Sequence, residues 1–200
     1  MSSSDSFFID PQNTREELMR ATYLALCECG YADLTIQRIS DEFPKSKSLI
    51  YHHYDGKDEL LLDFLEFMVD CFEGEVPFEN TDGADEHLRS VLDHVLATPL
   101  PNKRRGFAKA MVELRAQAAH DERYRDHFTR SDQFFRERIA SIIESGIEEG
   151  VFKEVNPDDA ATFLVTIING SMTERVTSDH DSARTLRAQV EEYVTYTLTE

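Results

Sequence analysis

Residues 35–60 read TIQRISDEFPKSKSLIYHHYDGKDEL, and this stretch predicts two short helices joined by a tight turn. Thr35 can cap the first helix, because its hydroxyl can accept a hydrogen bond from a free backbone N–H of the first turn. Pro44 ends that helix, since the residue before a proline is pushed out of the helical region. Ser46 can cap the second helix, and Asp55-Gly56 ends it. Two helices joined in this way form the unit whose second helix enters the major groove of DNA.

The same stretch concentrates positive charge in an acidic protein. The whole chain has a formal net charge of -18, yet three of its six lysines, Lys45, Lys47 and Lys57, lie in this segment. A local basic cluster in an acidic protein indicates a surface that meets a polyanion, so we expect double-stranded DNA as a partner. The alternative is a solvated polar helix on a helical bundle. The candidate DNA-contacting residues on and beside the second helix are Lys45, Ser46, Lys47, Ser48, Leu49, Tyr51 and His52.

Several positions match the amino-terminal signature of a known family in register and without a gap. They are Gly30-Tyr31, Thr35, Ile39, Ser46, Lys47, Ile50-Tyr51, His53-Tyr54, Lys57 and Leu60. On these positions, residues 14–65 resemble the TetR-type transcriptional regulators. The chain departs from the signature at Phe43-Pro44-Lys45, where a small residue, a glycine and an apolar residue are usual, and at Ser48, where a glycine is common.

The resemblance implies a ligand-responsive repressor that binds a palindromic operator as a homodimer. It also implies that Tyr51 and Lys57 hold DNA phosphates, that Thr35 does so from the preceding helix, and that His53 packs inside the domain. A small molecule entering the carboxy-terminal bundle would shift the helix over residues 57–73. That shift would change the separation of the two recognition helices, so that two half-sites of fixed spacing no longer fit.

The rest of the chain also predicts helices, and no convincing strand pattern is found, so the expected fold class is all-α. Thr14 and Glu17 have the spacing of a capping box and open the first helix, which Gly30 ends. Asn156-Pro157 is typical of a helix start. Further helices are expected over residues 57–73, 85–97, 103–120, 123–149, 157–179 and 182–199.

These elements predict an amino-terminal helix-turn-helix domain and a carboxy-terminal helical bundle for ligand binding and dimerisation. In the homodimer, the last two helices would pair with their symmetry mates, and Gly170 and Ser171 would permit close approach. The expected division of the chain is a mobile arm over 1–12, the helix-turn-helix domain over 13–56, a connecting helix over 57–73, and the ligand-binding and dimerisation domain over 85–200.

Apolar residues from several of the helices would surround a central cavity. Such a lining favours a small hydrophobic or aromatic effector. The alternative is a filled core without a ligand. The candidate ligand-binding residues are Phe67, Met68, Cys71, Met111, Phe135, Ile139 and Phe163.

No catalytic residue, cofactor or metal site is expected. The sequence contains no G-x-S-x-G, H-E-x-x-H, P-loop or G-x-G-x-x-G motif, so an enzyme is not predicted. The sulfurs of Cys27 and Cys29 would lie on different faces of a helix, where a free cysteine more often acts as a small hydrophobe. An alternative function is a helical bundle that senses a metal or binds another protein without a small organic effector.

Composition also suggests the environment in which the protein works. No stretch approaches 18 apolar residues and the cysteines number only three, so we expect a cytoplasmic protein that does not enter a membrane. Asp and Glu total 39 against 21 Lys and Arg, and few of these cations are lysines. An acidic, lysine-poor surface is typical of proteins that work in molar salt, which favours a halophilic protein. The alternative is an ordinary acidic protein whose charge keeps it soluble.

Overall fold

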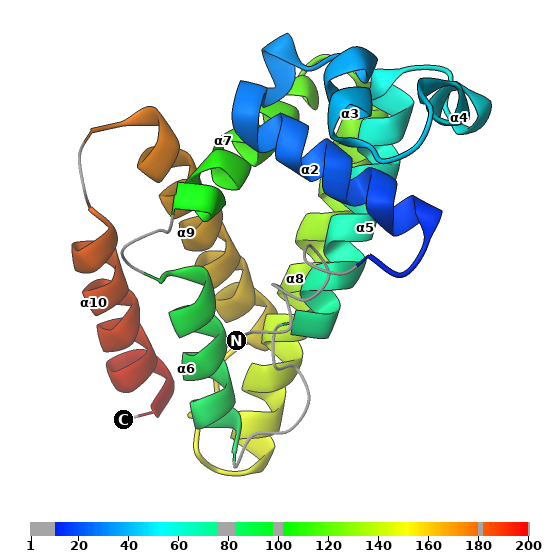
Figure 1. Cartoon of the computed structure of the whole chain (residues 1–200). Helices are drawn as coiled ribbons and strands as arrows, with labels where there is room; N and C mark the ends of the chain where they lie inside the picture. The colour runs from blue at the N-terminus through cyan, green and yellow to red at the C-terminus, as the bar shows by residue number, and fades with distance from the viewer. Residues whose placement is uncertain (1–10, 76–82, 98–101, 180–181, 200) are drawn as a thin grey trace. The chain divides into compact units, whose positions relative to one another are not determined.

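A computed structural model describes residues 11–75, 83–97, 102–179 and 182–199, and every regular element in these ranges is a helix (Figure 1). The predicted all-α fold class is therefore confirmed. Of the predicted arm over residues 1–12, residues 1–10 lie outside the described residues. The helices in chain order are α2 (Thr14–Asp33), α3 (Ile36–Glu42), α4 (Lys47–His53), α5 (Lys57–Glu75), α6 (Ala84–Val95), α7 (Asn102–Gln117), α8 (Glu122–Glu148), α9 (Pro157–Thr177), α10 (Ala183–Tyr193) and the π-helical η1 (Val194–Thr199).

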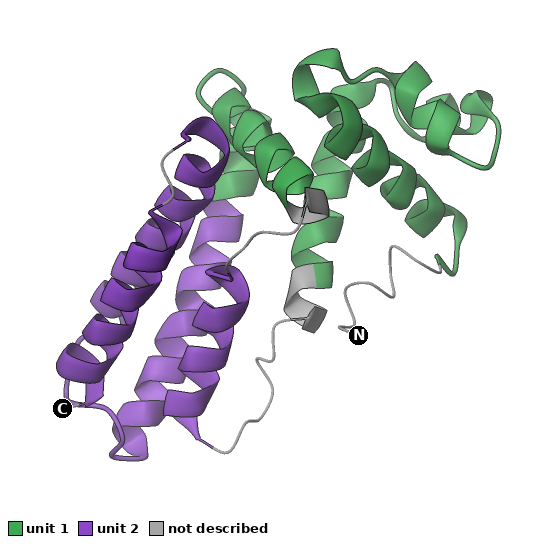
Figure 2. Cartoon of the chain, turned by 60° about the vertical axis from the view of Figure 1, so that its left-hand side comes forward, with its two compact units in different colours: residues 1–75, 101–128 green, residues 76–100, 129–200 purple. Residues whose placement is uncertain are grey.

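The chain forms two compact units, and the boundary between them falls within α8 (Figure 2). Unit 1 comprises residues 1–75 and 101–128, and unit 2 comprises residues 76–100 and 129–200. Helix α7 belongs to unit 1 because it packs along α2. The two compact units therefore differ from the predicted functional segments. Those segments were defined by their expected binding roles, and they stay a prediction.

The N-cap of helix α2 lies one residue before the predicted cap. Asn13 is the N-cap, and its side-chain oxygen accepts a hydrogen bond from the Glu16 backbone N–H at 3.0 Å. The Glu16 carboxylate accepts in return from the Asn13 side-chain amide at 2.8 Å. The capping box of Thr14 and Glu17 is therefore wrong by one residue. Both frames have suitable spacing, and asparagine is at least as good a cap as threonine.

Regular helical geometry in α2 breaks at Gly30, whose φ of +71° favours glycine. The Tyr31 backbone N–H donates to the Glu113 carboxylate of α7 at 2.6 Å. A Cβ atom at position 30 would lie only 2.7 Å from the same carboxylate. Gly30 thus ends the regular part of the helix, as predicted, and also gives α7 a close approach to α2.

The two helices of the helix-turn-helix have the predicted limits within a residue. Thr35 caps α3 by accepting a hydrogen bond from the Arg38 backbone N–H at 3.2 Å, and the chain leaves the helix at Phe43 before the proline. Ile39 of α3 and Ile50 of α4 are completely buried in the core of unit 1. Burial of these two side chains fixes which faces of α3 and α4 remain exposed.

A polar contact joins α2, α5 and the end of α4 within unit 1. The Arg15 guanidinium pairs with the Asp63 carboxylate at 2.5 Å, and the Tyr54 hydroxyl also donates to Asp63. Burial works against ionisation of Asp63, but the hydrogen bonds from Arg15 and Tyr54 outweigh it and hold the pKa of Asp63 below its ordinary value.

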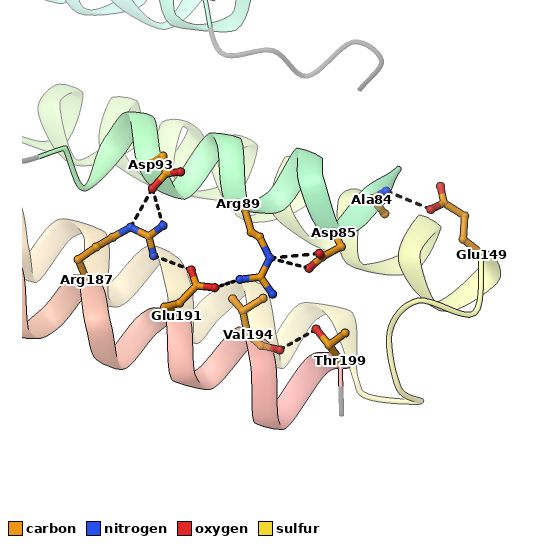
Figure 3. Close-up of polar contacts among 9 residues, drawn as sticks. All are labelled: Ala84, Asp85, Arg89, Asp93, Glu149, Arg187, Glu191, Val194 and Thr199. Atoms are coloured by element: carbon orange, nitrogen blue, oxygen red, sulfur yellow. Dashed lines mark hydrogen bonds and ion pairs between the residues drawn. The ribbon is translucent and has the colours of Figure 1, made fainter. Parts of the chain in front are cut away.

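In unit 2, ion pairs connect α6 with α10 (Figure 3). Arg89 pairs with Asp85 on its own helix and with Glu191 on α10. Arg187 pairs with Glu191 and also reaches Asp93 on α6. The two arginine side chains are only 28% and 23% exposed, so salt screens these pairs less than pairs in open solvent.

The last helix differs from its prediction over residues 182–199. Its α-helical part ends at Tyr193, and η1 continues to Thr199 with a wider turn. Lys153 contacts this segment: its backbone N–H donates to the Leu198 carbonyl at 2.7 Å, and its Nζ donates to the Tyr196 carbonyl at 2.9 Å. These contacts satisfy carbonyl groups at the end of the chain's last helix.

We predict that the Asp63 contact loses its stabilising effect in acid. The ordinary pKa of an aspartate is about 3.9, and the folded-state value lies below it. The contribution is therefore complete above about pH 4 and disappears as the pH falls through the folded-state pKa. Urea unfolding of the wild type and of Asp63→Asn from about pH 5 to pH 2.5 should show a stability difference that shrinks as the pH falls. A difference that stays constant over this range would contradict the prediction.

Candidate nucleic-acid interface

Helix α4 buries one apolar side chain completely in the core and presents a row of polar side chains to solvent. Because Ile50 is fully buried, the flanking positions face outward. Tyr51 is 54% exposed, and Ser48 and His52 are also exposed. Three of the predicted DNA-contacting residues therefore share the open face of this helix.

The turn before α4 carries Lys45 and Ser46, both exposed. The Lys45 ammonium donates to the Thr14 hydroxyl at 2.5 Å and pairs with the Glu17 carboxylate at the same distance. Ser46 occupies the N-cap position of α4, as predicted, but its side chain makes no capping hydrogen bond. The turn thus joins α4 to the start of α2 through a lysine.

Lys47, the first residue of α4, is linked to α3. Its Nζ donates to the Gln37 side-chain carbonyl at 2.9 Å and lies 5.7 Å from the centre of the Tyr51 ring. The Gln37 amide in turn donates to the Asp41 carboxylate at 2.7 Å. Sequence reasoning did not select Gln37, since nothing in the local pattern shows that it meets α4.

Two predicted residues are partly engaged within the protein. Leu49 is half-buried and packs against the core of unit 1, so little of it remains for a DNA contact. Lys57 is also half-buried, and its Nζ donates to the carbonyls of Tyr31 and Leu34, each at 3.2 Å. The same ammonium lies 4.3 Å from the centre of the Tyr31 ring, a favourable cation–π distance. Lys57 therefore fixes the start of α5 to the end of α2.

The next residue, Asp58, extends this junction to α8. Its Oδ1 accepts hydrogen bonds from the hydroxyls of Tyr31 and Tyr124, both at 3.2 Å. Burial and the neighbouring charge of Asp58 raise the pKa of both tyrosines, so the two hydroxyls stay protonated and can donate. The junction thus connects three helices of unit 1 that lie beside the helix-turn-helix.

Both histidines at the end of α4 are exposed. Their rings lie 5.1 Å apart in an edge-on arrangement. The expected packing role of His53 is therefore wrong. Tyr54 takes the more buried position instead, because its hydroxyl can reach Asp63 while its ring covers the core.

The charges around this surface are mixed. Acidic side chains at Asp41, Glu42 and Asp55 are exposed beside the lysines and histidines. Lysine and serine side chains suit phosphates and base edges, and a tyrosine hydroxyl can donate to a phosphate. These side chains can therefore hold a nucleic-acid backbone. The exposed carboxylates repel phosphates, so a phosphate would bind only at the lysines, serines and tyrosine between them.

The predicted ligand-binding residues are divided between the two units. Those in unit 1 are Phe67, Met68, Cys71 and Met111, and those in unit 2 are Phe135, Ile139 and Phe163. Within unit 2, Ile139 is buried, whereas Phe163 is 43% exposed and lies 4.5 Å from the Tyr193 ring. A shallow pocket of about 290 Å³ in unit 2 has a different lining: Asp93, Leu96, Ala97 and Arg187.

Over the described ranges, no three His, Cys, Asp or Glu side chains gather in a way that could hold a metal ion. The described helices also include none that is both long and apolar enough to cross a membrane.

Two family models match the chain. The model described as bacterial regulatory proteins, tetR family, matches residues 18–64, which include the whole helix-turn-helix. The model described as the BetI-type transcriptional repressor, C-terminal, matches residues 84–199. The second match covers more than half of the chain, and it lies outside residues 14–65, which carry the sequence resemblance.

Similar proteins agree with these matches. A TetR transcription regulator from Haloarcula marismortui shares 38% identity and a TM-score of 0.84, covering 93% of this chain and 98% of its own. A transcriptional regulator from Saccharomonospora viridis, solved in complex with choline, shares 22% identity and a TM-score of 0.80, covering 93% and 97%. The repressor AcnR of Corynebacterium glutamicum is 25% identical over 167 residues, which is 84% of each chain.

These relatives are transcriptional regulators and not enzymes, as the absence of catalytic motifs led us to expect. Both parts of the chain, the exposed α4 with its supporting helices and the carboxy-terminal bundle, match the same group of proteins. The chain therefore belongs to the TetR family of transcriptional regulators.

Proposed function

We propose that the protein is a ligand-responsive transcriptional repressor that binds a palindromic operator as a homodimer. The observation that carries the proposal is α4, which exposes Ser48, Tyr51 and His52 and has two lysines at its amino-terminal end. Residues at the start of a recognition helix are the ones that reach base edges. The name of AcnR as a repressor supports repression over activation.

The lysines at this surface can reach phosphates at little cost. The Lys45 side chain is 39% exposed, and ion pairs at such positions contribute about 0–1 kcal/mol. Lys57 uses two of its three N–H groups on carbonyls, so one N–H remains for a phosphate. The proposed phosphate contacts of Thr35, Tyr51 and Lys57 are therefore compatible with their roles inside the protein.

The proposed division of labour places DNA binding in residues 13–56, connection in 57–73, and ligand binding and dimerisation in 85–200. The link between them would be the junction at Asp58, because α5 and α8 share this acceptor with the end of α2. A displacement of α5 or α8 breaks or moves these hydrogen bonds. The orientation of the helix-turn-helix would then change.

The proposed effector is a small molecule with apolar or quaternary-ammonium character. Within unit 2, Phe135 and the buried Ile139 of the predicted lining suit either an apolar group or an organic cation held over an aromatic face, whereas Phe163 is exposed. The choline complex of the Saccharomonospora viridis regulator supports choline as a first probe.

The proposed dimer surface consists of α9 and α10. On α9, Gly170 has no atom within 4 Å of an added Cβ, and Phe163 is exposed beside Tyr193 of α10. The open glycine would let a helix of the partner approach closely, and the exposed aromatic ring would bury apolar area against it. Twofold symmetry of such a dimer would be mirrored in a palindromic operator.

The proposed setting is the cytoplasm of a halophile. A net charge of -18 per chain opposes both compaction and approach to DNA unless it is screened. At about 1 M salt the Debye length is only ~3 Å, so that repulsion largely disappears. The similar regulator from the halophile Haloarcula marismortui supports this setting.

For DNA binding, we predict that Tyr51→Phe weakens operator affinity by roughly ten-fold or more per protomer, since one hydrogen bond to a charged phosphate contributes about 1.5–3 kcal/mol. The loss should be similar for all sequences, because phosphate contacts carry no base information. Fluorescence anisotropy with operator and random duplexes measures both. Tyr196→Phe, at a 65% exposed tyrosine of unit 2, is the control and should bind like the wild type. Equal affinities for all three proteins would exclude the Tyr51 contact.

For assembly, we predict that Gly170→Leu yields monomers, because the added side chain meets no atom of its own chain but would separate the paired helices. Sedimentation equilibrium measures the loss of dimer, and circular dichroism should show an intact helical fold. Ser141→Leu places the same side chain on an exposed position of α8 and should leave the dimer unchanged. A dimer that tolerates Gly170→Leu argues for another interface.

For the effector, we predict that choline chloride releases operator DNA more effectively than KCl at the same ionic strength. Phe135→Ala should reduce this difference, since it removes a ring from the proposed lining. Phe134→Ala, at the neighbouring ring 5.3 Å away, is the matched control. If choline chloride and KCl act identically on the wild type, choline is not an effector.

For salt, we predict that stability rises with KCl between about 0.1 and 3 M, as screening relieves the repulsion among acidic groups. Operator affinity should fall only slightly or even rise over the same range, whereas ordinary regulators lose affinity steeply through counterion release. Thermal unfolding and anisotropy titrations measure the two responses. Full stability in dilute buffer, together with a steep loss of binding in salt, would rule out the halophilic setting. The proposed repressor function would be unaffected.

A further inference from the structure

The side chain of Gln37 lies at the contact between α3 and α4 and is exposed. Its carbonyl oxygen accepts a hydrogen bond from Lys47 at 2.9 Å, and its amide nitrogen donates to Asp41 at 2.7 Å. Lys47 is the first residue of α4, where a recognition helix meets the base edges. Gln37 therefore belongs to α3 but lies beside the part of α4 that enters the groove.

The two contacts leave Gln37 with unused hydrogen-bonding capacity. A glutamine side chain offers two lone pairs on its oxygen and two hydrogens on its nitrogen. Lys47 occupies one lone pair and Asp41 occupies one hydrogen. One acceptor and one donor remain, side by side on the same planar amide.

The partners also fix the direction of the amide. The Lys47 ammonium can only donate, and the ionised Asp41 carboxylate can only accept. A flipped amide would place its nitrogen against the ammonium and its oxygen against the carboxylate, so both contacts would be lost. The remaining acceptor thus stays on the Lys47 side and the remaining donor on the Asp41 side.

Among the four bases, only adenine presents the complement of this pair in the major groove. Its N6 amino group donates and its N7 accepts, which is the pattern that a bidentate glutamine recognises. Guanine presents two acceptors and would oppose the glutamine oxygen, while thymine and cytosine each offer a single polar group.

We propose that Gln37 reads an adenine in each half-site of the operator, with Lys47 and Asp41 holding its amide in the required orientation. The inference rests on the proposed DNA-binding function and adds a base-reading residue from α3. Lys47 keeps two N–H groups for a neighbouring phosphate or guanine while it holds Gln37. Asp41 serves as a positioning residue and makes no DNA contact of its own.

The test is selection of duplexes from a random pool by the full-length wild type, Gln37→Ala, Asp41→Asn and Glu42→Gln. The wild type should prefer adenine at one position of each half-site by about five-fold to 150-fold, the range for a good bidentate contact. Gln37→Ala should abolish the preference at that position only. All three variants change exposed side chains, and thermal unfolding checks that each remains folded.

Asp41→Asn and Glu42→Gln together separate the orientation of the Gln37 amide from the general effect of negative charge on DNA binding. Each removes one negative charge from neighbouring exposed positions of α3, so both should raise affinity for all DNA to a similar degree. Only Asp41→Asn replaces an obligate acceptor by a group that can also donate, so that Lys47 alone then holds the glutamine amide in its direction. It should therefore weaken the adenine preference, whereas Glu42→Gln should leave it intact.

Two results would overturn the inference while leaving the proposed function in place. One is an unchanged base preference in Gln37→Ala, and the other is an equal base preference in Asp41→Asn and Glu42→Gln. If the wild type selects no sequence at all, the proposed function fails together with the inference.

Discussion

The Asp58 carboxylate accepts hydrogen bonds from Tyr31 at the end of α2 and from Tyr124 near the start of α8. Lys57, one residue earlier, holds the carbonyls that follow the break in α2, and Glu113 of α7 holds the Tyr31 backbone N–H. Four helices of unit 1 therefore meet around a single tyrosine. Because α3 and α4 lie in the chain between α2 and α5, the junction sets the frame in which the recognition helix is presented.

Charge imposes the second constraint on this surface. In a chain with a net charge of -18, each lysine beside α4 has a partner within the protein: a carboxylate for Lys45, an amide oxygen for Lys47 and backbone carbonyls for Lys57. These partners hold the ammonium groups in place before DNA arrives. Most of the contacts are exposed or only half-buried, so a phosphate can compete with them, and an ammonium that keeps a free N–H can contact DNA without leaving its partner.

Elements that depend on neighbouring residues were predictable from the sequence. Thr35 caps α3, Phe43-Pro44 ends it, and Asn156 caps α9 as predicted, because each acts on backbone groups one to four residues away. The same local rules gave two acceptable frames at the start of α2, and the choice of Asn13 over Thr14 could not be made from spacing alone. The exposed face of α4 was also largely predictable. Ile50 is an aliphatic residue in a largely polar helix, and such a residue is expected to face the core and leave the polar positions around it exposed.

The sequence by itself determined the helices, the helix-turn-helix and the family, because hydrogen bonding within a turn and the periodic burial of apolar side chains act over short distances along the chain. Only the tertiary structure decided how the polar side chains are used. Glu113 meets Tyr31 across 82 residues, Lys57 holds two carbonyls more than 20 residues away, and Gln37 faces Lys47 from another helix. Such contacts depend on how helices pack against one another, and a long polar side chain can reach whichever partner that packing brings near.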